Sequence, residues 1–367
     1  MVAAKEQSNA ARQSAIAAFI KKSGWDSAKQ SSIAGDASSR SYKRLETSRS
    51  TAILMNAPPA AETSFCPPNA DEKARIALGY NAEARLAGPN LHAFVKIAET
   101  LSTAGLSAPA IYAYDAELGA ALIEDLGDCL FVNAVSAGID ETLLYENAVD
   151  VLSALHSIAP TPPNAVEYKM MTYDTTAMLA EVALIPDWYW PHLKKEPAPY
   201  DLKIEYKTLW RNALDCLAPP SAIVLRDYHA ENLLWLPERD GVQKVGLIDF
   251  QDGLIGSPAY DLVSVLEDAR RDVPVDLAAK MVDRYCANAS ATKKFDENQF
   301  RTEFAILGAQ RNAKILGIFA RLINRDKKPR YADFLPRVEN HFRNNLKHPA
   351  LANIKKFFDK HFPDLTL

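Results

Sequence analysis

A predicted β-hairpin in the second half of the chain, within residues 225–250, constrains the fold more than any other feature. Two short apolar runs, residues 233–236 and 245–248, lie on either side of a polar turn, which is typical of a hairpin. Asn232 immediately precedes the first run, and Asp249 immediately follows the second. The hairpin would therefore hold Asn232 and Asp249 close together at its open end.

Asp227 extends this polar cluster, because it lies on the loop between an apolar run at residues 222–225 and the hairpin. One carboxylate can orient a hydroxyl and accept its proton, while an Asn and a second Asp hold Mg²⁺ against phosphate oxygens. Asp and Asn are also common at strand ends because they cap turns, so their spacing alone is weak evidence. Strands, loop and polar residues together favour phosphoryl transfer.

Predicted strands and helices divide the chain into two unequal parts. Four short β-prone segments precede residue 125, at residues 41–45, 51–55, 111–114 and 120–124. Amphipathic patterns elsewhere predict helices at residues 10–22, 91–104, 142–157, 178–193, 200–216, 277–287, 300–322 and 331–362. We therefore expect an α+β chain with a small antiparallel β-sheet lobe at residues 1–126 and a larger, mainly helical lobe at residues 127–367. Residues 63–90 are rich in Ala, Pro and Asn and are interpreted as an insertion in the first lobe.

Length, charge and cysteine usage narrow the class of protein. A chain of 367 residues exceeds one compact core, and its 48% apolar and 24% charged residues are ordinary for a soluble globular protein. The formal net charge of −4 gives no indication of nucleic-acid or membrane binding, and the apolar runs are shorter than the roughly 20 residues of a membrane span. The four cysteines are widely spaced, which favours reduced thiols in the cytoplasm. We expect a cytoplasmic monomer that acts on a small molecule.

The hairpin and its entering loop resemble the aminoglycoside and choline phosphotransferases, which are relatives of the protein kinases. Their signature is His-Gly-Asp-x-His-x-x-Asn followed by Ile-Asp-Phe or Ile-Asp-Trp, and it stands here as LRDYHAEN at residues 225–232 and IDF at residues 248–250. The resemblance implies a bilobal protein-kinase-like fold that uses ATP and Mg²⁺. It also implies roles for four residues. Asp227 would be the catalytic base, Asn232 and Asp249 the two metal ligands, and Asp261 a structural brace of the loop.

Further segments resemble one bacterial branch of this family, which includes the anomeric kinases of N-acetylmuramate and N-acetylglucosamine used in peptidoglycan recycling. These segments are residues 35–40, 54–59, 122–128, 187–189, 310–312, 317–322 and 328–331. The resemblance implies that an amino-sugar hydroxyl accepts the phosphoryl group. It also implies that ATP contacts a phosphate loop and the segment between the lobes, at Gly35, Asp36, Ala37, Ser38, Ser39, Arg40, Glu124, Asp125 and Leu126.

Two departures from the family pattern affect the predicted site. The first His of the signature is replaced by Leu225, which removes neither the base nor a metal ligand. The lysine expected on the third strand, where it would pair with the ATP phosphates, is replaced by Met55 or Asn56. Lys43 or Arg44 on the neighbouring strand could supply this cation, or both could simply face solvent; Arg44 is included among the predicted ATP-binding residues.

A basic region near the C-terminus bears on the substrate. Residues 301–347 contain eleven Lys and Arg against four Asp and Glu, which suits a carboxylated sugar better than a polycationic aminoglycoside. These cations could equally lie on exposed helix faces. Aromatic residues near position 188 could stack on a sugar, cage a choline group or pack in the core. The candidate substrate residues are Glu181, Trp188, Tyr189, His229 and Arg311.

Three alternatives remain open at this stage. The chain could phosphorylate another small hydroxyl compound, such as an aminoglycoside or a choline-like molecule. It could be a kinase fold that binds nucleotide without catalysis, which only the missing third-strand lysine supports. A metal-dependent hydrolase built on Asp227 and His229 is the third, although such sites usually need more His ligands.

Overall fold

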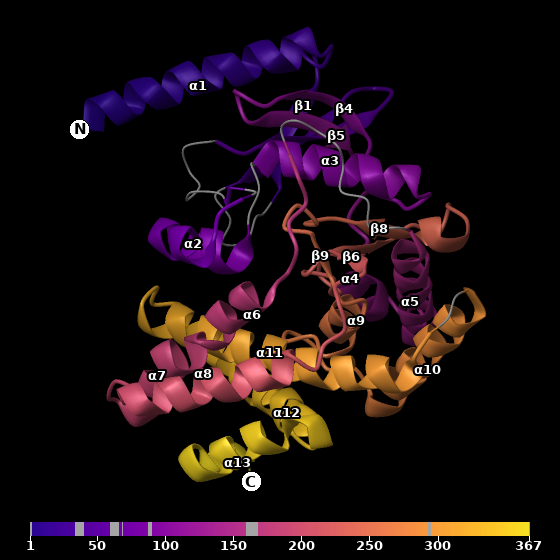
Figure 1. Cartoon of the computed structure of the whole chain (residues 1–367). Coiled ribbons are helices and arrows are strands. Elements are labelled where there is room, and N and C mark those ends of the chain that lie inside the picture. The colour runs from indigo at the N-terminus through magenta and orange to yellow at the C-terminus, as the bar shows by residue number, and fades with distance from the viewer. Residues whose placement is uncertain are drawn as a thin grey trace.

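The chain forms a sheet-containing N-terminal part and a mainly helical C-terminal part, which lie at opposite ends of the molecule (Figure 1). The structure is a computed structural model and describes residues 2–33, 40–58, 66–67, 69–86, 90–158, 168–292 and 295–366. The division into a β-rich and a helical part agrees with the prediction.

A five-stranded antiparallel sheet with the strand order β1-β2-β3-β5-β4 organises the N-terminal part. The four predicted strands are confirmed, and β1 is an addition, because its sequence KQSSI lacks the apolar alternation that marks a strand. The elements of this part are α1 (Val2–Lys22), β1 (Lys29–Ile33), β2 (Ser41–Glu46), β3 (Thr51–Asn56), α2 (Glu72–Leu78), the π-helical turn η2 (Asn81–Arg85), α3 (Asn90–Thr103), β4 (Ile111–Asp115) and β5 (Ala120–Glu124).

The two faces of this sheet have different partners. Leu54 packs with Phe19 and Ile20 of α1 on one face. Its neighbours Ile53 and Met55 belong to the larger core that includes α3 and continues into the helical part. This division follows from the alternation of side chains along a strand. Helix α1 therefore covers the outer face, and α3 lies on the face toward the C-terminal part (Figure 1).

The segment interpreted as an insertion contributes α2 and η2, although residues 63–65, 68 and 87–89 lie outside the described residues. Arg75 pairs with Asp174 at 2.7 Å, and Arg85 pairs with Asp252. Both acidic partners belong to the C-terminal part. The segment therefore connects the two parts through ion pairs.

The C-terminal part is built around the 28-residue helix α11, which packs against α6, α9 and α12 (Figure 1). Its elements are α4 (Phe131–Ser136), α5 (Glu141–Ser157), α6 (Thr175–Val182), η3 (Ile185–Tyr189), α7 (Trp190–Lys194), α8 (Tyr200–Leu214), β6 (Ala222–Val224), β7 (Leu233–Trp235), η4 (Gly241–Lys244), β8 (Val245–Leu247), β9 (Leu254–Gly256), α9 (Ala259–Leu266), α10 (Val275–Thr292), α11 (Glu297–Asn324), η5 (Pro329–Phe334), α12 (Leu335–Asn345), η6 (Pro349–Leu351), α13 (Ala352–His361) and α14 (Pro363–Thr366).

Two predicted helices are interrupted in the structure. Residues 178–193 form α6, a π-helical turn and α7, because Pro186 and Pro191 lack the N–H that a continuous helix needs. The tail at residues 331–362 is divided among η5, α12, η6 and α13, and Pro349 begins η6. Apolar periodicity identifies such segments as helical but does not locate these breaks.

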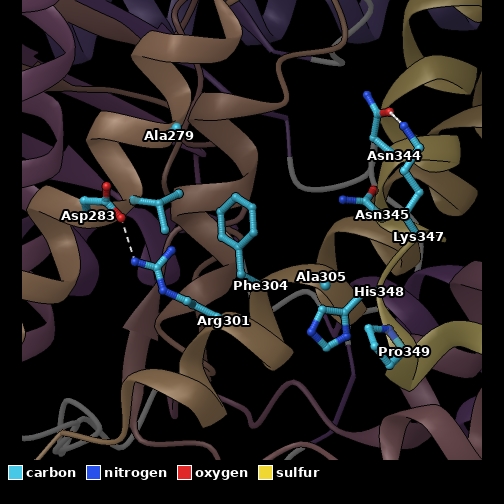
Figure 2. A pocket seen from close by; sticks show the side chains of 11 residues that line it. Ala279, Asp283, Arg301, Phe304, Ala305, Asn344, Asn345, Lys347, His348 and Pro349 are labelled. Carbon is cyan, nitrogen blue, oxygen red and sulfur yellow. Dashed lines mark hydrogen bonds and ion pairs between the residues drawn. The ribbon is translucent and has the colours of Figure 1, made fainter.

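A surface hollow of about 520 Å³ lies where α10 and the start of α11 meet the turn from α12 into η6 (Figure 2). Its lining mixes apolar and polar side chains, including Phe304, His348 and an ion pair between Arg301 and Asp283 at 2.6 Å. Lys314 lies further along α11, nine residues after Ala305 of the hollow's lining, and nine residues of helix span about 14 Å. The hollow is therefore separate from the site described below.

All four cysteines, Cys66, Cys129, Cys216 and Cys286, are thiols without a disulfide. Among the described helices, none combines the length and the hydropathy that a membrane crossing requires.

Candidate active site

The predicted hairpin is present as β7 and β8, which pair in antiparallel register. Leu233 lies opposite Leu247, and the backbone N–H of Ile248 donates to the carbonyl of Asn232 at 3.2 Å. Because Asp249 directly follows Ile248, it emerges beside Asn232. The open end of the hairpin therefore carries both predicted metal ligands.

The loop that enters the hairpin is held by Asp261 of α9. Its carboxylate accepts hydrogen bonds from the backbone N–H groups of Leu225 at 2.6 Å and Arg226 at 2.8 Å. Arg226 has φ 70°, a left-handed conformation that costs a non-glycine residue roughly 1–2 kcal/mol. Burial raises the pKa of Asp261 to about 7, and the two N–H groups oppose that rise. Helix α9 therefore fixes a strained turn of the loop.

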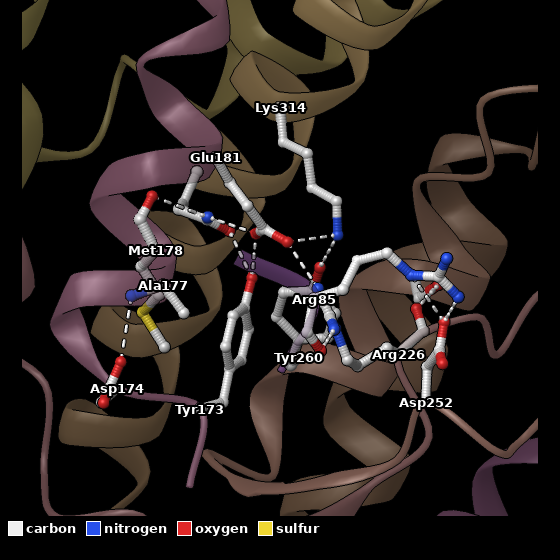
Figure 3. Close-up of polar contacts among 12 residues, drawn as sticks. Arg85, Tyr173, Asp174, Ala177, Met178, Glu181, Arg226, Asp252, Tyr260 and Lys314 are labelled. Atoms are coloured by element: carbon white, nitrogen blue, oxygen red, sulfur yellow. Dashed lines mark hydrogen bonds and ion pairs between the residues drawn. The ribbon is translucent and has the colours of Figure 1, made fainter. Parts of the chain in front are cut away.

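The Arg226 side chain anchors a buried ion cluster beside the loop (Figure 3). Its guanidinium donates to Glu181 at 2.5 Å and to the carbonyl of Arg85 at 2.8 Å, and it lies 4.9 Å from the ring centre of Tyr173. The Nζ atom of Lys314 lies 2.8 Å from the same Glu181 oxygen. Burial alone would raise the pKa of Glu181, but Lys314 and Arg226 outweigh it and hold that pKa below its usual value. Glu181, a candidate substrate residue, is fully buried and is engaged by the protein itself.

Asp227 is a half-buried carboxylate on the same loop. Burial would raise its pKa, but the nearby charges of Lys314, Arg226 and Arg311 contribute to an opposite effect that prevails, so the pKa of Asp227 is lowered. Asp227 is therefore ionised at neutral pH and can accept a proton. Of these cations, Lys314 lowers the pKa of Asp227 the most. The sequence gives no signal for Lys314 beyond its place in a basic, helical region.

Asn232 and Asp249 present oxygen atoms at the end of the hairpin. The amide of Asn232 donates to the carbonyl of Asp227 at 2.9 Å, which leaves its Oδ1 as the atom that can bind a cation. Asp249 has φ 59°, its side chain is 47% exposed, and it accepts a hydrogen bond from Gln251 at 2.8 Å. Partial burial is the main cause that raises the pKa of Asp249, and the negative charge of Asp227 is the second.

This donor set fits Mg²⁺. The ion prefers oxygen ligands and keeps several waters, so an amide oxygen and a carboxylate next to phosphates can suffice. The mutual repulsion of Asp227 and Asp249, which contributes to the raised pKa of Asp249, is what a divalent cation would relieve. The described residues include no group of three or more His, Cys, Asp or Glu that could hold a metal.

His229 is a buried, neutral side chain in the same loop. Its Nε2 faces the amide of Asn232 at 3.3 Å and the guanidinium of Arg270 at 3.4 Å, so this nitrogen acts as the acceptor and the proton resides on Nδ1. Burial lowers the pKa of His229 to about 4. This candidate substrate residue therefore supports the loop next to Asn232.

The predicted ATP-binding residues before β3 differ in their surroundings. Residues 35–39 lie outside the described residues. Arg40 is buried, and its Nη1 lies 3.7 Å from Asp249 Oδ1. Arg44 instead pairs with Asp125 at 2.7 Å and with Asp128 at 2.8 Å, in the segment between the two parts.

The same connecting segment is tied to the hairpin. Glu124, which ends β5, pairs with Arg239 in the hairpin turn at 2.5 Å, and Arg239 also donates to Ser107 at 2.7 Å. Leu126, two residues after Glu124, is half-buried. The predicted ATP-binding segment between the lobes is therefore held against the hairpin, next to Asn232.

The remaining candidate substrate residues each have a partner within the helical part of the protein. The ring of Tyr189 is buried, and its hydroxyl donates to Glu339 at 2.6 Å. Trp188 is half-buried, with the Arg325 guanidinium 5.9 Å from its ring centre. Arg311 is buried and donates to the carbonyl of Glu267 at 3.4 Å, although its charge reaches Asp227. The aromatic pair thus packs into the helical core.

Comparisons with known proteins agree with this geometry. Residues 29–297 match the phosphotransferase enzyme family. An N-acetylmuramate/N-acetylglucosamine kinase of Caulobacter vibrioides is 42% identical over 96% of this chain and 97% of that protein. A protein of the same name from Pseudomonas aeruginosa is 30% identical over 87% of this chain and 84% of that protein. A solved ethanolamine kinase of Plasmodium vivax has a TM-score of 0.53 at 12% identity, over 89% of this chain and 84% of that one, which shows a shared fold.

The similarity covers the sheet, the hairpin and the helix that holds the loop, since residues 29–297 contain all three. The expected bilobal, protein-kinase-like arrangement is confirmed by the sheet followed by helices and by the kinase with the same fold. On the strength of that match and of relatives aligned over nearly its whole length, the chain belongs to the phosphotransferase enzyme family.

Proposed function

We propose that this protein transfers the γ-phosphoryl group of ATP to the anomeric hydroxyl of N-acetylmuramate or N-acetylglucosamine. One observation carries the phosphoryl-transfer part of this proposal: an ionised Asp227 whose carbonyl accepts the Asn232 amide at 2.9 Å, at the hairpin end that also bears Asp249. The names of the relatives from Caulobacter vibrioides and Pseudomonas aeruginosa support the choice of sugar.

In this proposal each residue of the loop has a defined role. Asp227 accepts the proton of the attacking hydroxyl, and its lowered pKa keeps it ready to do so. Asn232 and Asp249 hold Mg²⁺, which when bound would neutralise charge on the phosphates. Asp261 keeps the loop in place through its hydrogen bonds to Leu225 and Arg226.

The charges near Asp227 support an acceptor that is not a polycation. Lys314, Arg226 and Arg311 all lower the pKa of Asp227, so these three cations lie close enough to act on the proposed base. A polycationic aminoglycoside would be repelled by them, whereas a neutral or carboxylated sugar would not. The sugar acid N-acetylmuramate therefore suits this surrounding better than kanamycin does.

The expected monomeric state and cytoplasmic location remain part of this proposal. Light scattering after size exclusion would test the monomer, and a stable dimer at micromolar concentration would refute it.

The experiment that tests the function is an ATP-consumption screen with Mg²⁺ over N-acetylmuramate, N-acetylglucosamine, glucosamine, choline and kanamycin. We expect turnover with the two N-acetyl sugars. Phosphorus–proton coupling to the anomeric proton in NMR spectra of the product would identify the acceptor hydroxyl. Turnover with kanamycin or choline alone would refute the sugar assignment, and tight ATP binding without turnover of any acceptor would favour a non-catalytic nucleotide-binding module.

A further inference from the structure

The third strand carries no cation toward the site. Strand β3 reads TAILMN, and Met55, which faces the core side of the sheet, is 1% exposed. Met55 pairs directly with Tyr42 of β2. A side chain that replaces the missing lysine must therefore come from another position on this face.

The sequence offered two cations of β2, Lys43 and Arg44, as replacements for the third-strand lysine, but both have other partners. Lys43 donates to Gln30 of β1 at 3.3 Å, and the strand alternation puts it on the face of Leu45, which packs against α1. Arg44 forms its ion pairs with Asp125 and Asp128, in the segment between the two parts. The partners of Lys43 and Arg44 are therefore Gln30, Asp125 and Asp128 rather than Asp249.

Arg40 occupies the position that these residues leave open. It lies two residues before Tyr42, and a step of two along an extended chain returns to the same face, which is the face of Met55. Its side chain is 6% exposed, and its Nη1 lies 3.7 Å from Asp249 Oδ1. A buried guanidinium therefore lies next to the carboxylate assigned to Mg²⁺. In the sequence, Arg40 directly follows residues 35–39 of the predicted phosphate loop.

We propose that Arg40 supplies the cation that binds the ATP phosphates, in place of a third-strand lysine. The inference rests on the proposed function for its nucleotide. A guanidinium binds phosphate oxygens through two parallel N–H groups and stays charged at every physiological pH, so it can take over the role of an ammonium group. Asp249 holds the guanidinium next to the proposed Mg²⁺ position, where the phosphates must lie.

The opposite face of the sheet fixes the chain next to Arg40. Arg12 of α1 donates to Asn56 Oδ1 at 2.6 Å, and the amide of Asn56 donates to Ser41 Oγ at 3.2 Å. Ser41 is the residue directly after Arg40 and pairs with Asn56 across the strands. Helix α1 therefore helps to hold the backbone from which Arg40 reaches the site.

Calorimetric titration of the full chain with ATP, ADP and adenosine tests this role without relying on turnover. We expect Arg40→Gln to weaken ATP and ADP binding about 10- to 100-fold, the effect of losing a charge-assisted contact, and to leave adenosine binding unchanged. Arg40→Lys should retain most of the affinity. Lys43→Met, which removes a cation from the other face of the same strand, should bind all three ligands like the wild type.

A second variant returns the charge to the third strand. In Arg40→Gln combined with Met55→Lys, recovery of ATP affinity would support the proposal. Wild-type ATP affinity in Arg40→Gln, or an equal loss of adenosine binding, would overturn it. If Arg40→Gln does not fold, as judged by its melting curve, ATP and adenosine titrations of Arg40→Met, which also removes the charge, decide in the same way: a loss confined to ATP supports the role, and unchanged or equal affinities overturn it. Failure of the wild type to phosphorylate any sugar would refute the proposed function while leaving these binding results interpretable.

Discussion

Asp261 accepts the backbone N–H of Arg226 at 2.8 Å across 35 residues of sequence. The bond stabilises a left-handed residue immediately before Asp227, and Ser264 of the same helix donates to the Arg226 carbonyl at 3.2 Å. The position of the proposed base is therefore set by α9 and by the ion cluster around Glu181. The variants below separate residues that act in the reaction from residues that hold this arrangement.

Asp227→Asn should abolish phosphoryl transfer and leave nucleotide binding largely intact. The amide has nearly the same shape but cannot accept the hydroxyl proton, and a positioned base contributes about 10²- to 10⁴-fold to a rate. Steady-state turnover with N-acetylmuramate and calorimetry with ATP measure the two effects. A turnover within a few-fold of the wild type would contradict the assignment of the base.

Asp249→Asn should remove the Mg²⁺-dependent part of ATP binding, at least about tenfold in affinity. Asn tolerates the left-handed backbone found at this position, so the variant changes charge more than shape. In EDTA the variant should bind ATP as well as the wild type or better, because one carboxylate that repels the phosphates is gone. An unchanged gain in affinity on adding Mg²⁺ would contradict the metal role.

The hairpin and the polar residues at its end were predictable because they depend on local patterns. Two continuous apolar runs, a polar turn and the flanking Asn232 and Asp249 are all contained in one short stretch of sequence. Lys314 was not predictable, because its contact with Glu181 joins two helices far apart in the chain.

The different partners of Arg40 and Arg44 were equally beyond the sequence. Arg40 immediately precedes β2 and Arg44 lies within it, and only three-dimensional packing shows that the first pairs with Asp249 and the second with Asp125. The burial of Glu181 and Tyr189 also depends on how helices assemble. Residue type therefore indicated the chemistry, whereas tertiary contacts decided which side chains reach the site.

His229 should make the protein sensitive to acid. The folded-state pKa is about 4, below the ordinary value of 6.5, so as pH falls from 6.5 toward 4 the unfolded chain takes up a proton that the folded chain refuses. This group alone should lower the free energy of unfolding by up to about 3 kcal/mol across that range, with no effect above it. His229→Gln should lose this dependence, because glutamine does not titrate.

Urea unfolding at pH 7.5, 6 and 5 would measure that dependence. The stability of the wild type relative to His229→Gln should fall as pH falls. His92→Gln, on α3 outside the loop, controls for the loss of a histidine. Parallel pH curves for the wild type and His229→Gln would show that His229 does not resist protonation in the folded state.

Glu181→Gln should destabilise the fold by about 3–5 kcal/mol, because it leaves the buried cations Arg226 and Lys314 without their shared carboxylate. The exposed pair of Asp187 with Lys203 offers a matched comparison, and Asp187→Asn should cost less than about 1 kcal/mol. Chemical unfolding measures both. If Glu181 instead contacted the sugar, its variant would raise the KM for N-acetylmuramate with little change in stability, and that result would contradict the structural role that its complete burial implies.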